Sequence, residues 1–170
     1  MHSIYARANA IFAFMLWVLT AVTLGCFFST VFLDYTTSGK IEVGEIKVRK
    51  VADYASESGH ADVAHLDFSL AVDVSKAFNW NVKQLFLYLV AEYETPAHKV
   101  NQVVIWDEIV HRAERVVIDE RKTRPEYWLL DDGTSLLGNK NVTFILRYNV
   151  VPNAGYLRLG QAEGAIKVSK

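Results

Sequence analysis

The longest apolar stretch of the chain lies near its amino terminus. No charged residue occurs between Arg7 and Asp34, and the apolar centre of this gap covers residues 10–33. A helix of about 20 residues crosses the hydrocarbon core of a bilayer. The backbone must satisfy its own hydrogen bonds in lipid, so a helix is the form expected there. The pattern predicts a short amino terminus over 1–9, then an uncleaved transmembrane signal-anchor helix over 10–33.

A cleaved signal peptide is the main alternative for this segment. Its apolar region would cover roughly 7–15 residues and end at small residues, and residues 21–23 and 24–26 resemble such ends. The apolar run continues through Phe27, Phe28 and Phe32, however, which favours an anchor. The same continuation argues against lipid modification at Cys26.

Small residues recur at every fourth position of the apolar segment, at Ala21, Gly25 and Ser29. Residues four apart lie on one side of a helix, and small side chains let two helices approach closely in lipid. We predict that Ala21, Gly25 and Ser29 form a packing face for another membrane helix. The alternative is that these residue types are simply common in membrane helices.

Residues 34–170 show mostly a period of two. Apolar and polar residues alternate over 66–75 and over 141–150, which is typical of half-buried strands. Two apolar pairs fall out of phase across Gly44, which predicts one strand with a bulge. Turn-forming residues occur at 132–133, 138–140 and 152–155. We therefore predict a mainly β fold, an antiparallel β-sandwich over 34–170.

Residues 85–91 are apolar on both faces of a predicted strand and are too few to span a membrane. A central strand covered on both sides has this pattern, and so does a strand whose second face binds a partner. Phe86, Tyr88 and Val90 would form that second face. The charged stretch over 111–124 is predicted to be a solvated hairpin or loop.

Composition excludes several classes of protein. A formal net charge of −1 argues against a nucleic-acid binder, and 12% aromatic residues argue against disorder. The 1 cysteine allows neither an intrachain disulfide nor a Cys-based zinc site.

Motifs for catalysis, cofactors or metals are not found. The sequence has no Gly-rich phosphate loop, no Gly-x-Ser-x-Gly and no His-Glu-x-x-His. His60, Asp62 and His65 form the only cluster with a conceivable ligand spacing, but they lie in a predicted loop and a zinc site needs a further ligand. We expect solvated loop histidines, and no catalytic, cofactor or metal site.

Asn141 begins the sequon Asn141-Val142-Thr143. The alternation points Val142 and Phe144 inward and Asn141 outward, and a glycan needs that exposure and a secretory lumen. The positive-inside rule gives nearly a tie between the two flanks of the apolar segment. The sequon favours a cytosolic amino terminus over 1–9 and a lumenal domain after Leu33, with an N-linked glycan at Asn141.

Several unusual strings stand out together, namely RANAIFAF at 7–14, WNVKQLFLYL at 80–89, NQVVIWD at 101–107, LGNKNVT at 137–143 and NVVPNAG at 149–155. The chain resembles subunit 3 of the eukaryotic signal peptidase complex, from its first residues to about Gly155. Beyond Gly155 the resemblance fades, because that family usually has a longer tail.

The resemblance implies a single-pass type II protein of the endoplasmic-reticulum membrane with a lumenal β-sandwich, glycosylated at Asn141. It implies a non-catalytic accessory subunit that supports a separate catalytic subunit in removing signal peptides. Its partners would be that subunit, other membrane subunits and lipid. The alternative is a free-standing type II membrane glycoprotein whose β-sandwich binds a peptide or glycan. A hydrolase that uses His60 or His65 is the least favoured hypothesis.

Overall fold

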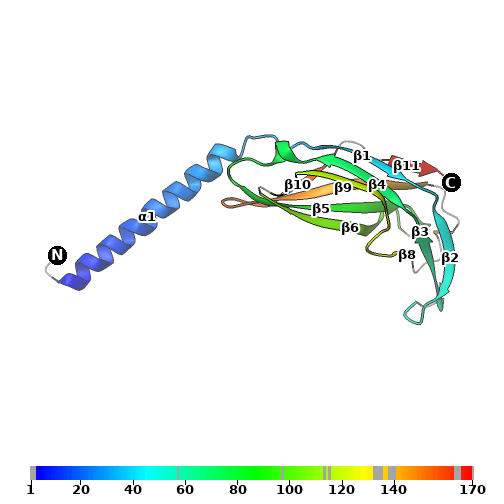
Figure 1. Ribbon diagram of the computed structural model, residues 1–170. Helices are drawn as coiled ribbons and strands as arrows, with labels where there is room; N and C mark the ends of the chain where they lie inside the picture. The colour runs from blue at the N-terminus through cyan, green and yellow to red at the C-terminus, as the bar shows by residue number, and fades with distance from the viewer. Residues whose placement is uncertain are drawn as a thin grey trace.

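The computed structural model describes residues 3–56, 58–96, 98–112, 114, 116–131, 136–137, 141–162 and 166–169. Its first element is a long helix, α1 (Ile4–Thr30), which stands away from the β domain (Figure 1). The Ser3 hydroxyl accepts a hydrogen bond from the Tyr5 amide at 3.2 Å and so caps the first turn. The helix thus begins before the predicted range 10–33 and ends earlier, because polar residues can join its first turns and Thr30 is held by the domain. By length and composition α1 could cross a membrane.

The domain after α1 is built from antiparallel strands, which confirms the predicted class. A five-stranded sheet has the order β10-β9-β5-β6, with β11 also pairing with β9. A three-stranded sheet has the order β1-β4-β7, and a second one the order β2-β3-β8. The bounds are β1 (Ser38–Val43), β2 (Lys47–Ala52), β3 (His60–His65), β4 (Phe68–Asp73), the 3-10 turn η1 (Ser75–Ala77), β5 (Val82–Tyr93), β6 (Asn101–His111), β7 (Val117–Thr123), β8 (Leu129–Asp131), β9 (Asn141–Pro152), β10 (Arg158–Gln161) and β11 (Ile166–Ser169).

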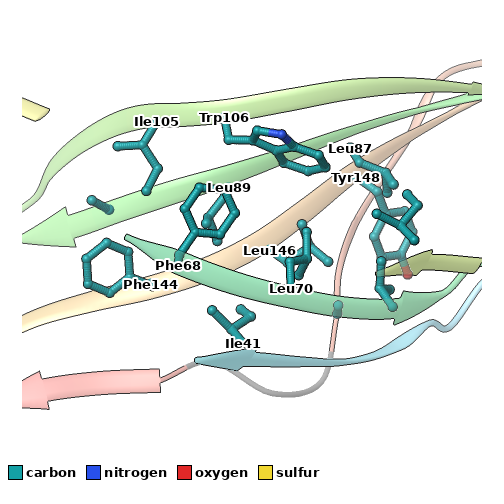
Figure 2. Close-up of a cluster of buried hydrophobic side chains, with 14 of the residues drawn as sticks. Ile41, Phe68, Leu70, Leu87, Leu89, Ile105, Trp106, Phe144, Leu146 and Tyr148 are labelled. Carbon is teal, nitrogen blue, oxygen red and sulfur yellow. The ribbon is translucent and has the colours of Figure 1, made fainter. Parts of the chain in front are cut away.

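The core lies between the five-stranded sheet and the β1-β4-β7 sheet. Figure 2 shows Phe68 and Leu70 of β4 facing Leu89 of β5 and Leu146 of β9 across this core. Side chains on a strand alternate between its two faces, so the period of two becomes one buried row per strand. The strands predicted over 66–75 and 141–150 are confirmed as β4 and β9. Complete burial of one such side chain contributes about 1.5–3 kcal/mol.

The predicted single strand with a bulge at Gly44 is wrong. The chain instead forms two strands, and β1 pairs with β4 whereas β2 pairs with β3 in another sheet. The segment β1–β2 runs beside the segment β3–β4, and both change sheet at the same level. At that level the Gly44 amide donates to the carbonyl of Asp67 at 2.8 Å. Because both segments change sheet together, the change of phase at Gly44 marks the point where the chain passes from one sheet to the next. It does not mark an extra residue within one strand.

The predicted solvated hairpin or loop over 111–124 is also wrong in part, because β6 and β7 belong to different sheets. Residues 117–123 form β7, which pairs with β4 and buries Ile118 completely. Because β7 lies at the edge of its sheet, most of its residues are charged or exposed. Its one fully buried residue is therefore hard to recognise in the sequence. Residues 85–91 do form a central strand, since β5 lies between β9 and β6. The turn after β9 is confirmed over 153–155, whereas the predicted turns at 132–133 and 138–140 lie outside the described residues.

Candidate functional site

The end of α1 is joined to the β-sandwich by a buried hydrogen-bond network centred on Asn81. The Asn81 side-chain amide donates to the Thr30 hydroxyl oxygen at 2.9 Å and to the carbonyl of Ala154 at 2.8 Å. Its own carbonyl oxygen accepts from the amide of Ala154 at 3.0 Å. Both Asn81 and Thr30 are buried. One side chain therefore connects α1, the start of β5 and the loop after β9.

Local turns place Asn81 at this position. The Asn79 side chain accepts the Asn81 amide at 2.9 Å, which is the side-chain-to-backbone turn that asparagine favours. The Asn81 carbonyl in turn accepts the Asn153 amide at 2.7 Å. Two loops that are far apart in sequence are thus held together beside the last turn of α1.

A glycine allows close contact on the other side of the same loop. Gly155 has a φ of +122°, and a Cβ added there would lie 2.8 Å from Cδ2 of Phe27. The Phe27 ring also packs against Tyr156, with 5.8 Å between ring centroids. Only a residue without a side chain fits this backbone conformation against the helix.

Arg158 provides the third contact of the junction. Its guanidinium donates to the carbonyls of Val31 and Leu33, just beyond the end of α1, and lies 4.8 Å from the centre of the Tyr35 ring. A cation there suits the negative end of the helix dipole. The Tyr35 hydroxyl donates to the Thr30 carbonyl at 3.1 Å.

Tyr148 connects this junction to the core. Its hydroxyl donates to the Tyr35 carbonyl at 2.7 Å, and burial raises the pKa of the Tyr148 phenol. These contacts together define the junction, which fixes the direction of α1 relative to the sandwich.

The outer face of the five-stranded sheet carries the predicted partner residues. Phe86 and Tyr88 are half-buried and stack with 5.4 Å between ring centroids. Val90 is only 2% exposed, next to a register shift between β5 and β6. Because Val90 is buried, it cannot line an accessible surface, and we drop it from the predicted interface.

The remainder of this outer face changes character along β5. Near the junction, Phe86 lies beside Ile109 of β6 on one side. On its other side lies Asn149 of β9, followed by Leu159 of β10. Ile109 and Leu159 are both exposed. Arg147 of β9 and Asp107 of β6 lie directly beside Tyr88, and Arg147 forms an ion pair with Glu92, farther along β5, at 3.2 Å. The face is therefore apolar around Phe86, close to α1, and becomes charged from Tyr88 onward.

The predicted helix-packing residues Ala21, Gly25 and Ser29 are exposed, and a Cβ on Gly25 would meet nothing within 4 Å. Gly25 precedes Phe27 by two positions, which is a rotation of about 200° around the helix. The small-residue face thus points away from the side of α1 that contacts the sandwich, and this chain leaves it uncovered.

The segment that holds His60, Asp62 and His65 is a strand, not the predicted loop. Neighbours on a strand face opposite ways, so His60 and His65 lie on different faces. His60 contacts the Ser58 carbonyl, His65 packs edge-on against Trp128, and buried Asp62 accepts the Leu137 amide at 2.8 Å. Within the described residues, no three His, Cys, Asp or Glu side chains are grouped so that they could hold a metal ion.

Asn141 is exposed at the first residue of β9, while Val142 and Phe144 point into the core. The predicted orientation of the sequon is therefore correct, and its glycosylation stays a prediction.

The comparisons with known proteins agree with the resemblance found in the sequence. A family model described as "Signal peptidase subunit" matches residues 1–169. A Caenorhabditis elegans protein named "Signal peptidase complex subunit 3" is 60% identical over 168 residues, covering 99% of this chain and 93% of the relative. The Drosophila melanogaster protein of that name is 45% identical over 96% of this chain and 92% of the relative. The human one is 42% identical over 99% and 93%.

The chain belongs to the signal peptidase subunit family. The resemblance found in the residue strings is confirmed, and the match continues past Gly155, where we expected it to fade. As a member of this family, the chain is a non-catalytic accessory subunit of the signal peptidase complex of the endoplasmic-reticulum membrane.

Sequence analysis missed the residues of the junction in this subunit. Asn81, Gly155 and Arg158 each lie in or beside a string that carries the family resemblance, but nothing in their spacing along the chain connects them. They meet only because β5 pairs with β9.

Proposed function

We propose that this subunit crosses the membrane once, keeps its amino terminus in the cytosol, and holds the catalytic subunit through its lumenal β-sandwich. The observation that carries the proposal is the junction at Asn81, because a scaffold must hold its binding surfaces at a fixed height and angle to the membrane. The buried bonds from Asn81 to Thr30 and Ala154 provide that fixed geometry.

Pull-down from mild-detergent microsomes tests the proposal as a whole. A tagged chain should co-purify with a separate peptidase subunit, and the eluate should cleave a preprotein. A clean, inactive monomer would contradict the proposal. It would instead favour the free-standing glycoprotein, whose ligand would need a site such as the open cleft of about 580 Å³ beside Tyr127 and Trp128.

The lumenal orientation can be tested at Asn141. β9 extends for 12 residues from Asn141 to Pro152 beside the junction, so Asn141 lies roughly 35 Å from the end of α1. The parent chain should run faster on a gel after endoglycosidase treatment, and Asn141→Gln should abolish this change. Thr143→Ser keeps the sequon and serves as the matched control. A parent chain without a glycan in microsomes would contradict the proposed glycosylation.

The proposed contact with the catalytic subunit lies on the outer face at Phe86 and Tyr88, where the apolar part of this face meets its charged part. Tyr88→Asp replaces an aromatic ring by a charge at a half-buried position, and we expect weaker co-purification of the catalytic subunit because interface cores are rich in aromatic residues and poor in charged ones. Tyr54→Asp, at a fully exposed tyrosine, is the matched control.

The melting temperature separates an interface from a core position in this test. If Tyr88→Asp unfolds the chain as severely as Leu87→Asp, at a core position of the same strand, then Tyr88 is a core residue and the proposed surface is wrong.

The proposed helix-packing face is tested separately. Gly25→Leu fills the space beside Gly25 and should weaken association with other membrane subunits, because close helix approach requires small residues. Leu24→Ile, at an exposed position on another side of α1, should have no effect. Equal co-purification of both variants would show that α1 packs through a different face.

A further inference from the structure

One loop of the sandwich reaches down beside the last turn of α1. Gly155 and Tyr156, in the loop between β9 and β10, both contact Phe27, which lies one turn before the end of α1 at Thr30. Three residues of helix correspond to about 4.5 Å. This loop therefore lies slightly below the end of the helix on the membrane side, at the end of the sandwich nearest α1 (Figure 1).

Large exposed side chains are carried by residues close in the chain to these contacts and to Asn81. Trp80 is 51% exposed, Tyr156 56%, Leu157 59% and Phe32 90%. We call these four residues the junction patch. Arg112 holds the Trp80 backbone by a 2.6 Å hydrogen bond to its carbonyl, and the Arg158 guanidinium lies 5.4 Å from the centre of the Tyr156 ring.

The depth of the junction patch identifies its surroundings. Because buried hydrogen bonds join the loop and Asn81 to Thr30, the patch cannot move independently of the end of α1. If α1 spans the bilayer, its end lies at the boundary between hydrocarbon and headgroups. Tryptophan and tyrosine are enriched at that boundary, because each combines an apolar ring with a polar group. Arginine extends its charge from there toward water and phosphate.

We propose that the junction patch inserts into the headgroup boundary of the lumenal leaflet, so that phospholipid covers it. The sandwich is then held on the membrane at two places, by α1 and by the patch, which prevents it from rotating about the helix axis. This inference rests on the proposed membrane span of α1, and it does not depend on which subunit binds the outer sheet face.

Spin labels on the full chain test the inference. In a Cys26→Ala background, single cysteines are placed at Leu157 in the patch, at Val18 in α1, and at Tyr54 far from the patch. The labelled chains are reconstituted in phosphatidylcholine nanodiscs. Relaxation by oxygen, which concentrates in lipid, is compared with relaxation by a water-soluble nickel chelate.

The expected ratio of oxygen to nickel relaxation is several-fold higher at position 157 than at position 54, and highest at position 18. A ratio at 157 equal to that at 54 overturns the inference while leaving the span intact. A low ratio at 18 overturns the span itself. A label at 157 that neither reagent reaches shows that protein covers the patch, which also overturns the inference. Trp80→Cys, from the other loop of the patch, provides an independent second probe and should give a similar ratio to Leu157→Cys.

Discussion

The junction at Asn81 makes a sharp prediction about the stiffness of this subunit. Asn81→Ala removes the only side chain that bonds to both α1 and the loop after β9 in the part of the chain that the structure describes. We expect α1 to stay helical and the sandwich to stay folded. The angle between them should become variable, because the contact at Phe27 and the bonds of Arg158 do not replace the lost bonds.

The magnitude follows from the bonds that are lost. Three side-chain hydrogen bonds at about 1 kcal/mol each contribute about 3 kcal/mol. The amide and carbonyl of Ala154 also lose their partners, but at a half-buried position where water can replace part of each bond, so the expected cost stays at about 3 kcal/mol. Thr30 loses less, since its hydroxyl also contacts the carbonyls of Cys26 and Phe27 at 3.3 Å. For a domain of this size the loss corresponds to a fall in melting temperature of about 10 °C.

Distance measurement between two spin labels tests the predicted loss of stiffness. With Cys26 replaced by alanine, labels at Ile11 on α1 and at Tyr54 on the sandwich should give one narrow distance distribution in the parent and a broad one in Asn81→Ala. Asn101→Ala is the matched control, because the Asn101 side chain also forms three hydrogen bonds, all as donor, but between β5 and β6, away from the junction. An unchanged distribution in Asn81→Ala would refute the role assigned to this residue.

Three further substitutions test the junction and the core. Gly155→Ala should destabilise the chain by about 1–3 kcal/mol in thermal unfolding, from positive φ and contact with Phe27, and Phe27→Ala in the same chain should relieve only the contact. Phe68→Ala should cost about 3–5 kcal/mol by leaving a core cavity, clearly more than Phe86→Ala at a half-buried position. Burial raises the pKa of the Tyr148 phenol, so the contribution of Tyr148 to stability is complete below pH 10 and declines as the pH rises above that value. Tyr148→Phe should therefore remove part of the loss of stability at alkaline pH. A variant with the same dependence of stability on pH as the parent would contradict this prediction.

The sequence predicts the strands of the sandwich because a strand with one buried face alternates between apolar and polar residues. Over 141–150 every second side chain faces the core, so hydrophobicity alone shows the strand and the outward direction of Asn141. The same argument finds β4 and the central position of β5. The argument fails at β7, because an edge strand rich in charged residues shows no clear alternation. It also fails at Gly44, because a bulge and a change of sheet produce the same change of phase in the sequence.

The junction could not be predicted from such patterns. Asn81 and Ala154 are polar or small residues in loops, where hydropathy has no period. Their meeting depends on the register between β5 and β9, and that register is a property of the folded sheet. Val90 shows the same limit, because its position in the alternation predicts an outward side chain and only the folded structure shows that this side chain is buried.

The pairing of β5 with β9 also has a consequence for how the chain is made. Synthesis proceeds from the amino terminus at roughly 5–20 residues per second, so α1 emerges first and β5 waits several seconds for its neighbour. During that interval one edge of β5 is open for pairing with another chain, which is a hazard for aggregation. The position of α1, which is made first, is thus fixed by one of the last loops to be made. A chain that stops before Ala154 would keep α1 but would lack the loop contacts that hold the sandwich against it.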